Sequence, residues 1–152
     1  MTSKLNILKI DHQDGIIEFS LTNGGYSIEN NCISISIETD SIDEDAFPPC
    51  ANICIVNHPI KDALRVGDSF EFSGGMNRDP DEAIKACGYF TFHADHIFVK
   101  WTVVSIDKEH VVFRLESNHD DVNYYDSRAK QCPTNGQFSL SLKKRSALWI
   151  PS

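Results

Sequence analysis

Apolar and polar residues alternate with a period of two through residues 96–116, HIFVKWTVVSIDKEHVVFRLE. This alternation places every second side chain on one face of a strand, and the polar break in the middle predicts two strands that form a central hairpin. A shared face requires a loop with an odd number of residues, so we expect a three-residue loop at 106–108, or a tight two-residue turn corrected by a bulge. The seven apolar residues on this face are Ile97, Val99, Trp101, Val103, Val111, Phe113 and Leu115.

Shorter alternating ribbons predict further strands. In CISISIE, the three isoleucines face one way and the two serines the other, which is typical of an antiparallel sheet with one solvated face. Asn23-Gly24 and Asn135-Gly136 predict turns, because both residue types tolerate positive φ. Pro59 predicts the end of the strand that begins at residue 51. The additional strands are expected at residues 4–10, 15–22, 32–38, 51–56, 69–73, 89–93 and 137–142.

One helix start stands out after Gly74-Gly75. Asp79 is a good N-cap, Pro80 suits the first helical position and Glu82 completes a capping box, so a helix is predicted over residues 80–87. Residues 119–131 have weaker helical spacing. With about nine or ten short strands, the sequence predicts a mainly β protein of one domain, residues 1–152. The expected architecture is an antiparallel β-sandwich or a partly closed barrel with one or two short helices.

Composition places the chain among ordinary globular proteins. It has 152 residues, 41% of them hydrophobic, with no apolar run long enough to span a bilayer and no visible secretory signal. The five cysteines form no disulfide framework and are expected to be reduced thiols. A cytoplasmic location without membrane attachment is therefore the expectation.

The net charge of −8 is unevenly distributed. No lysine or arginine lies between Lys9 and Lys61, and all 22 acidic residues lie at or before Asp126, against nine basic residues there. Only bases follow, among them the cluster Lys143, Lys144 and Arg145. Such a field repels nucleic acid and favours a basic partner for the acidic part, and we expect no nucleic-acid binding.

Candidate catalytic chemistry is sparse. His93, Asp95 and His96 are the most site-like cluster, but the expected reading is a solvated loop between two strands. Cys50 and Cys54 are expected to share a strand face and to pack there. The sequence contains no nucleophile elbow, no HExxH motif and no phosphate-binding loop, so neither an enzyme nor a metal or other cofactor is predicted.

Two acidic segments with embedded aromatic residues are the best candidates for partner binding. The first, TDSIDEDAF, is read as an exposed loop over residues 39–49, and the second is HDDVNYYD. Charges of this kind steer association and aromatic side chains anchor it; the alternative is a solvated acidic surface. The predicted partner-binding residues are Asp40, Asp43, Glu44, Asp45, Phe47, Asp120, Asp121, Tyr124, Tyr125 and Asp126.

This acidic, motif-poor profile resembles the immunity proteins of bacterial toxin–immunity systems, including those of contact-dependent growth inhibition. The resemblance lies in composition and in the two acidic segments, so it assigns no residue a role. It implies a small cytosolic protein that binds a cognate toxin, often a basic nuclease, and covers its active site. The alternatives are a small β-barrel enzyme or ligand-binding protein that uses residues 93–96, and a structural subunit of a phage or secretion system.

Overall fold

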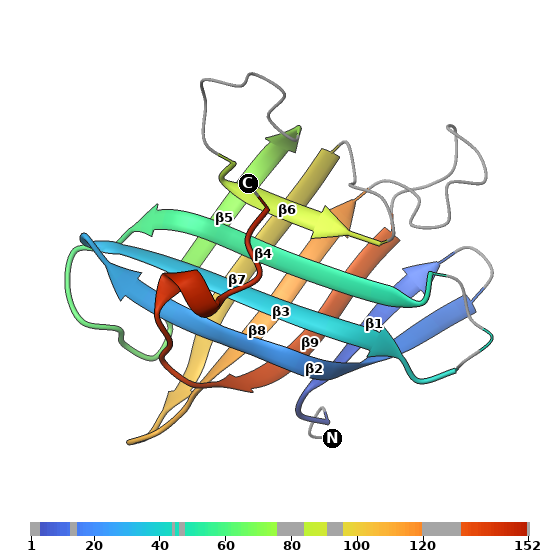
Figure 1. The fold of residues 1–152 in the computed structure, drawn as a ribbon, viewed down its shortest axis with the longest axis horizontal. Coiled ribbons are helices and arrows are strands. Elements are labelled where there is room, and N and C mark those ends of the chain that lie inside the picture. Colours follow the sequence, from blue (N-terminus) through green and yellow to red (C-terminus); the bar gives the residue numbers. More distant parts are fainter. Residues whose placement is uncertain are drawn as a thin grey trace.

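The computed structural model describes residues 4–12, 15–43, 45, 48–75, 84–90, 96–119 and 132–151. These residues form nine strands and one 3-10 turn (Figure 1). The strands are β1 (Ile7–His12), β2 (Gly15–Glu29), β3 (Cys32–Ser41), β4 (Cys50–Pro59), β5 (Ser69–Gly75), β6 (Ala86–Tyr89), β7 (His96–Ile106), β8 (Val111–His119) and β9 (Cys132–Leu140), and the turn is η1 (Arg145–Ala147).

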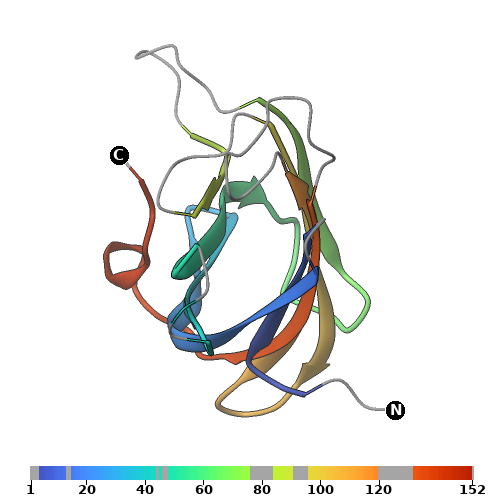
Figure 2. The same ribbon diagram turned by 90° about the vertical axis from the view of Figure 1, so that its right-hand side faces the viewer.

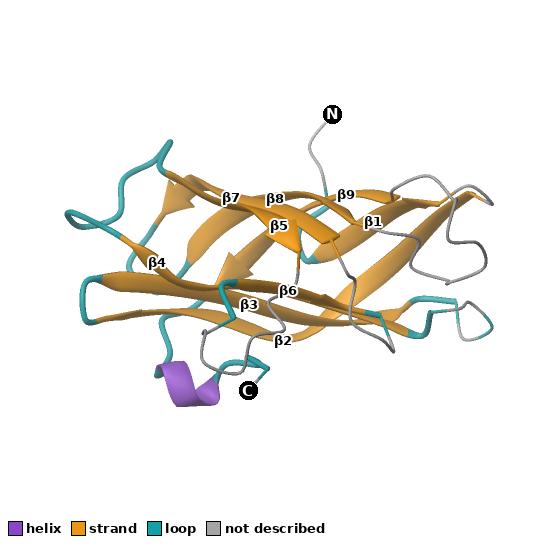
Figure 3. Cartoon of the chain, turned by 90° about the horizontal axis from the view of Figure 1, so that it is seen from above, coloured by secondary structure: helices purple, strands orange, loops and turns teal. Residues whose placement is uncertain are grey.

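All nine strands belong to one antiparallel sheet in the order β5-β7-β8-β9-β1-β2-β3-β4-β6. The sheet curls until its two halves face each other across a common interior (Figures 2 and 3). It is nearly closed and barrel-like, which confirms the predicted mainly β, antiparallel class; of the two expected architectures, the partly closed barrel is the one formed. The sheet stays open between its edge strands, β5 and β6.

The central hairpin β7–β8 supplies two of the buried aromatic residues of the described core, Trp101 and Phe113. All seven apolar residues predicted to share a face are buried. Trp101 packs edge to face against Phe113 and against Phe138 of β9, with ring centroids 6.3 Å apart in both pairs. Such pairs contribute about 0.5–1.5 kcal/mol beyond the burial of their area, so this cluster ties β7, β8 and β9 together.

The loop of this hairpin differs from the predicted three residues. Four residues, 107–110, join the strands, and the Asp107 N–H donates to the His110 carbonyl at 2.9 Å. A β-bulge between Val103 and Ser105 then shifts the register by one residue. Because the hydrogen bond between Asp107 and His110 closes the loop, only Lys108 and Glu109 lie within a tight two-residue turn. The alternative of a tight turn corrected by a bulge is therefore the one formed, and the bulge keeps both apolar sets on the same face.

Neither Asn-Gly pair turns the chain. Gly24 lies within β2 and Gly136 within β9, where a neighbouring strand leaves little room for a side chain at Gly24 and none at Gly136. A Cβ at Gly24 would lie 3.0 Å from the Ser36 carbonyl oxygen, and one at Gly136 would lie 2.5 Å from the Ile7 carbonyl oxygen. These glycines therefore permit close strand approach rather than positive φ, and the two predicted turns are wrong.

Other predicted boundaries also move. Strand β4 continues through the predicted break to Pro59, because Asn57 adopts a φ of 52° and donates its N–H to Ser34 Oγ. Strand β3 runs to Ser41, so the first three residues of the predicted loop 39–49 are strand. Residues 86 and 87, predicted to end a helix, belong to β6 instead, and residues 80–83 lie outside the described residues.

Gly136→Ala is expected to lower the free energy of unfolding by about 1–3 kcal/mol or more. The added methyl group would lie 2.5 Å from the Ile7 carbonyl oxygen and 2.8 Å from the Phe138 ring. Urea unfolding followed by tryptophan fluorescence measures the change. Ser20→Ala, at an exposed position of β2, is the matched control and should have little effect. An unchanged urea midpoint for Gly136→Ala would contradict the close approach of β9 to β1.

Asp107 should give the hairpin turn a pH-dependent stability. Its carboxylate accepts the backbone N–H groups of His110 and Glu109, at 2.8 and 2.9 Å, and these bonds lower the pKa of Asp107. A pKa that is lower in the folded state than in the unfolded state stabilises the fold at pH values above the ordinary pKa of a carboxyl group. This stabilisation is lost as the pH falls through the folded-state pKa. Asp107→Ala should therefore lower the urea midpoint more at pH 7 than at pH 3, while Ser105→Ala, an exposed position without a titratable group beside the same turn, should show no such difference.

Candidate functional site

The first predicted acidic segment lies at one end of the sheet, at the right in Figure 1. Asp40 lies in β3 opposite Ser20, with its side chain exposed on the outer face of the sheet. Asp43 follows, and its carboxylate accepts the Asp45 N–H at 3.0 Å. The three aspartates are exposed and close along the chain. Glu44 and Phe47 lie outside the described residues.

The structure adds neighbours that the sequence prediction missed. The Ile42 N–H donates to the Glu18 carbonyl at 3.0 Å, which extends the β2–β3 pairing by one residue and places Ile42 opposite Glu18 on the outer face. Ile16 lies two residues along β2 on this same face, opposite Asp11 of β1. Ile16 is 67% exposed and Ile42 is 55% exposed. Two large apolar side chains are thus left in water among carboxylates.

We call this surface the acidic patch. It has five carboxylates around two isoleucines, and Lys9, opposite Glu18, is the basic residue among them. Large apolar side chains that stay exposed within one contiguous surface mark interaction sites more often than singly scattered ones do. The acidic patch consists of Asp11, Ile16, Glu18, Asp40, Ile42, Asp43 and Asp45.

The basic residues near the end of the described chain lie far from the acidic patch. Lys143 Nζ donates to Asn23 Oδ1 at 3.0 Å, and the Arg145 N–H donates to Glu29 Oε2 at 2.7 Å. Along β2, Asn23 is three residues from Ser20, the partner of Asp40, and seven residues from Ile16, or about 10 Å and about 23 Å at the rise of a strand. Both distances exceed the Debye length of about 8 Å at physiological ionic strength, so the charges of these bases are largely screened from the acidic patch.

The second predicted acidic segment lies outside the described residues, so Asp120, Asp121, Tyr124, Tyr125 and Asp126 are not placed. The residues that bracket it are described. His119 ends β8 opposite Cys132, which begins β9, and Thr134 lies opposite Ile10 next to Asp11. Both predicted segments therefore connect to the same end of the sheet.

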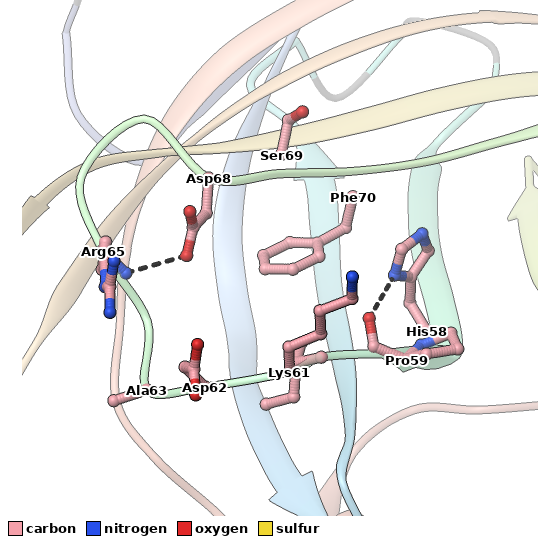
Figure 4. Close-up of a pocket in the computed structure, with 10 residues that line it drawn as sticks. His58, Pro59, Lys61, Asp62, Ala63, Arg65, Asp68, Ser69 and Phe70 are labelled. Atoms are coloured by element: carbon pink, nitrogen blue, oxygen red, sulfur yellow. Dashed lines mark hydrogen bonds between the residues drawn. The ribbon is translucent and has the colours of Figure 1, made fainter.

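The opening of the sheet holds two clefts that the sequence did not predict. The smaller, about 230 Å³, lies where the link from β4 to β5 leaves the sheet (Figure 4). The larger, about 670 Å³, lies between β4 and β5 and is lined by Ile55, Val56, Glu71, Phe72 and Lys85 among others. His58 and Pro59 line both clefts, so the two adjoin.

His58 is held in place at this junction. Its ring packs edge to face on Phe70 with centroids 5.4 Å apart, and its Nδ1 lies 3.0 Å from the Pro59 carbonyl oxygen (Figure 4). Lys61 and Arg65 line the smaller cleft together with Asp62 and Asp68. The Asp68 carboxylate accepts the Arg65 N–H at 2.9 Å, so this group shapes the turn. The balanced charges favour no ligand of one sign.

The other predicted cluster is only partly described. His93 and Asp95 lie outside the described residues, and His96 begins β7 opposite Gly75. Cys50 and Cys54 share one face of β4, as predicted; it is the outer face, where they lie opposite Asp40 and Ser36 of β3. In the described part of the chain, no three His, Cys, Asp or Glu residues are grouped closely enough to hold a metal ion.

Comparison with protein-family models, curated proteins and solved structures finds no match to this chain in any of the three. Within the described ranges, no helix has the length and apolar character needed to cross a membrane. The function is therefore inferred from the acidic patch and the clefts themselves.

Proposed function

We propose that this protein acts by binding and that it neutralises a basic protein toxin, plausibly a nuclease, by covering the toxin's active site with the acidic patch. One observation carries the proposal: the exposed Ile16 and Ile42 lie on the outer face of β2 and β3 among five carboxylates. A complementary surface would have lysine and arginine residues around an apolar centre.

The two kinds of side chain do different work in such a complex. The carboxylates steer a basic partner and select against acidic ones, because charge complementarity acts chiefly on the association rate and on specificity. The isoleucines contribute to the lifetime of the complex, and burying one such side chain fully is worth about 1.5–3 kcal/mol. A nuclease active site that attracts phosphate groups also attracts carboxylates, so the acidic patch would imitate the negative charge of the substrate.

The sheet suits this role because it presents the acidic patch on a firm base. Asp11, Glu18 and Asp40 belong to β1, β2 and β3, three neighbouring strands with continuous backbone pairing. Beneath them, Ile10 and Phe19 are completely buried. Side chains held on such a base lose little backbone entropy on binding, which favours affinity.

The test uses the purified product of the neighbouring gene as the candidate toxin. The triple variant Glu18→Gln, Asp40→Asn and Asp43→Asn should slow association at low salt and flatten its salt dependence. The double variant Ile16→Ser and Ile42→Ser should instead raise the dissociation rate by at least about tenfold, which corresponds to about 1.4 kcal/mol. Surface plasmon resonance gives both rates, and growth on co-expression shows whether the toxin is neutralised.

Val66→Ser and Glu71→Gln are the matched controls. Val66 is 64% exposed and Glu71 is also exposed, but both lie outside the acidic patch, near the opening of the sheet. These variants should bind like the parent. The proposal fails if the acidic patch variants associate and dissociate at parental rates, or if the controls weaken binding equally.

The larger cleft favours binding of a small ligand as a second candidate function. Its volume of about 670 Å³ lies in the usual range of about 300–1,000 Å³ for ligand sites, and Ile55, Val56 and Phe72 give it an apolar wall. A small-molecule fragment screen by NMR should then shift resonances of this wall, and Phe72→Ala should abolish the shifts while Val66→Ser leaves them intact. Shifts that persist in Phe72→Ala would place the ligand elsewhere.

A further inference from the structure

The segment that follows β9 forms a strap across the outside of the sheet. The strap, residues 141–151, crosses the outer faces of β2, β3 and β4 (Figures 1 and 3). It begins beside β2, where the Lys143 N–H donates to the Tyr26 carbonyl at 2.8 Å. Further on, Arg145 Nε donates to Asn57 Oδ1 at 3.1 Å. Ser36 Oγ donates to the Trp149 carbonyl at 2.7 Å and fastens the last part of the strap to β3.

Two cysteines lie beneath the end of the strap. Cys54 of β4 and Cys87 of β6 are direct partners in the β4–β6 register, on the outer face of the sheet. With Val56 they form a small buried cluster, separate from the barrel core, against which Trp149 and Ile150 pack. Cys54 is completely buried and Cys87 is 1% exposed. The indole of Trp149 also lies beside Tyr89 of β6, with ring centroids 6.2 Å apart.

The register brings the two cysteines within the reach of a disulfide. The Val56 N–H donates to the Lys85 carbonyl at 2.8 Å, which marks that position as a hydrogen-bonded pair. Pairs alternate along an antiparallel ladder, so Cys54 and Cys87 are also a hydrogen-bonded pair, with an expected Cα separation of about 5.5 Å. Disulfides usually span Cα separations of about 4.4–6.8 Å and Cβ separations of about 3.5–4.5 Å. The Cβ atoms of a hydrogen-bonded pair lie about 5.5 Å apart, so bond formation requires the short edge strand β6 to shift by about 1 Å on β4. Cys32, Cys50 and Cys132 each lie opposite a residue other than cysteine in the described strands.

Burial keeps both thiols protonated while the strap is in place. It raises the pKa of Cys54 far above its usual range and raises the pKa of Cys87 to about 12. Because the thiolate is the species that attacks a disulfide, the covered thiols react slowly. Exposure of the cluster to water would lower both pKa values and release this reactivity.

We propose that Cys54 and Cys87 are a redox-active pair that closes to an intramolecular disulfide when the end of the strap, residues 148–151, lifts from the sheet. The oxidant is a small-molecule disulfide. One cysteine thiolate attacks it and releases the first small thiol; the other cysteine then attacks the mixed disulfide and releases the second. The two cysteines lose two electrons and two protons, and the oxidant becomes two thiols.

The disulfide between Cys54 and Cys87 would fasten an edge strand, β6, to the sheet. Strand β6 has four residues and pairs only with β4 in the described sheet. A covalent bond between Cys54 and Cys87 would hold β6 on β4 independently of the backbone ladder. The pair thus makes the attachment of this edge strand sensitive to the redox state of its surroundings.

The experiment incubates the full chain with oxidised glutathione at pH 8 and counts thiols after denaturation. The chain has five cysteines, so the count should fall from five to three, and peptide mapping should find residues 54 and 87 joined. Cys54→Ala and Cys87→Ala should each prevent the joined peptide. A stable count of five, or glutathione carried by Cys32 or Cys50 alone, would overturn the proposal.

The role of the strap is tested by the rate of oxidation. Trp149→Ala removes the cover. Each unit by which a thiol pKa falls raises the thiolate fraction about tenfold and lowers the nucleophilicity of the thiolate about threefold, so oxidation should accelerate about threefold or more. Ser36→Ala should accelerate it too, because it removes the hydrogen bond that holds the Trp149 carbonyl on β3. Leu142→Ala truncates an exposed apolar residue of the same strap and should leave the rate unchanged.

Gly136→Ala is the control that separates a loss of global stability from a loss of the cover over the cysteines. Gly136 lies in β9, away from the cysteine cluster. Oxidation of this variant should be slower than that of Trp149→Ala under conditions where both variants are folded. Equal acceleration by Gly136→Ala, or no difference between Trp149→Ala and Leu142→Ala, would show that the strap does not control access.

Discussion

Pairing of β1 with β9 is the contact on which the whole structure depends, because it joins the two halves of the sheet. Asn6 supports this junction in a left-handed backbone conformation with a φ of 66°. Its N–H donates to the Gln137 carbonyl at 2.7 Å, and its carbonyl accepts the Leu21 N–H at 2.9 Å. Its side chain also accepts the Ser139 N–H at 3.0 Å. One residue thus links β9, β1 and β2 where the sheet curls. The barrel interior forms only because this curl is maintained.

The sequence was informative where one face of a strand had to be buried. Alternation correctly assigned the interior residues of the central hairpin, as well as Ile33, Ile35 and Ile37 of β3. Sequence-based prediction failed where the close approach of two strands determined which residue could be accommodated. Asn135-Gly136 has the composition of a turn, yet the distant Ile7 carbonyl excludes a side chain at Gly136. Such a contact arises from the curl of the complete sheet, and local composition carries no sign of it.

The candidate site was also predictable only in part. Three described residues of the acidic patch, Asp40, Asp43 and Asp45, came from the run of carboxylates in the sequence. Glu18 and Ile16 did not, because their place beside this run follows from the β2–β3 register, which shifts between Leu21 and Asn23. A signal existed nevertheless. Two consecutive isoleucines, at positions 16 and 17, place one apolar side chain on the wrong face of an amphipathic strand, and the structure shows that Ile16 is the exposed one.

The clefts had no comparable signal, because they lie between β4 and β5, which follow one another along the chain but have no backbone pairing with each other. His58 meets Phe70 only because the curl brings β4 and β5 together at the open edges of the sheet. Open edges are determined by strand order, and strand order cannot be read from alternation alone.

The outer face of β2 and β3 is divided into a covered part and an uncovered part, and this division connects the two proposed sites. Under the strap the face carries small residues such as Gly25, Ser27 and Ser36, and a Cβ at Gly25 would lie 2.8 Å from the Lys143 side chain. At the other end the same face carries Ile16 and Ile42, with no described segment over them. The strap therefore covers the part of this face that has small residues, and its end continues over the cysteine pair of β4 and β6. The part with large apolar side chains, which suit a partner, stays exposed. Because the strap also holds Lys143 and Arg145 at the covered end, the negative charge of the uncovered end stays unbalanced, which is the condition that attraction of a basic partner requires.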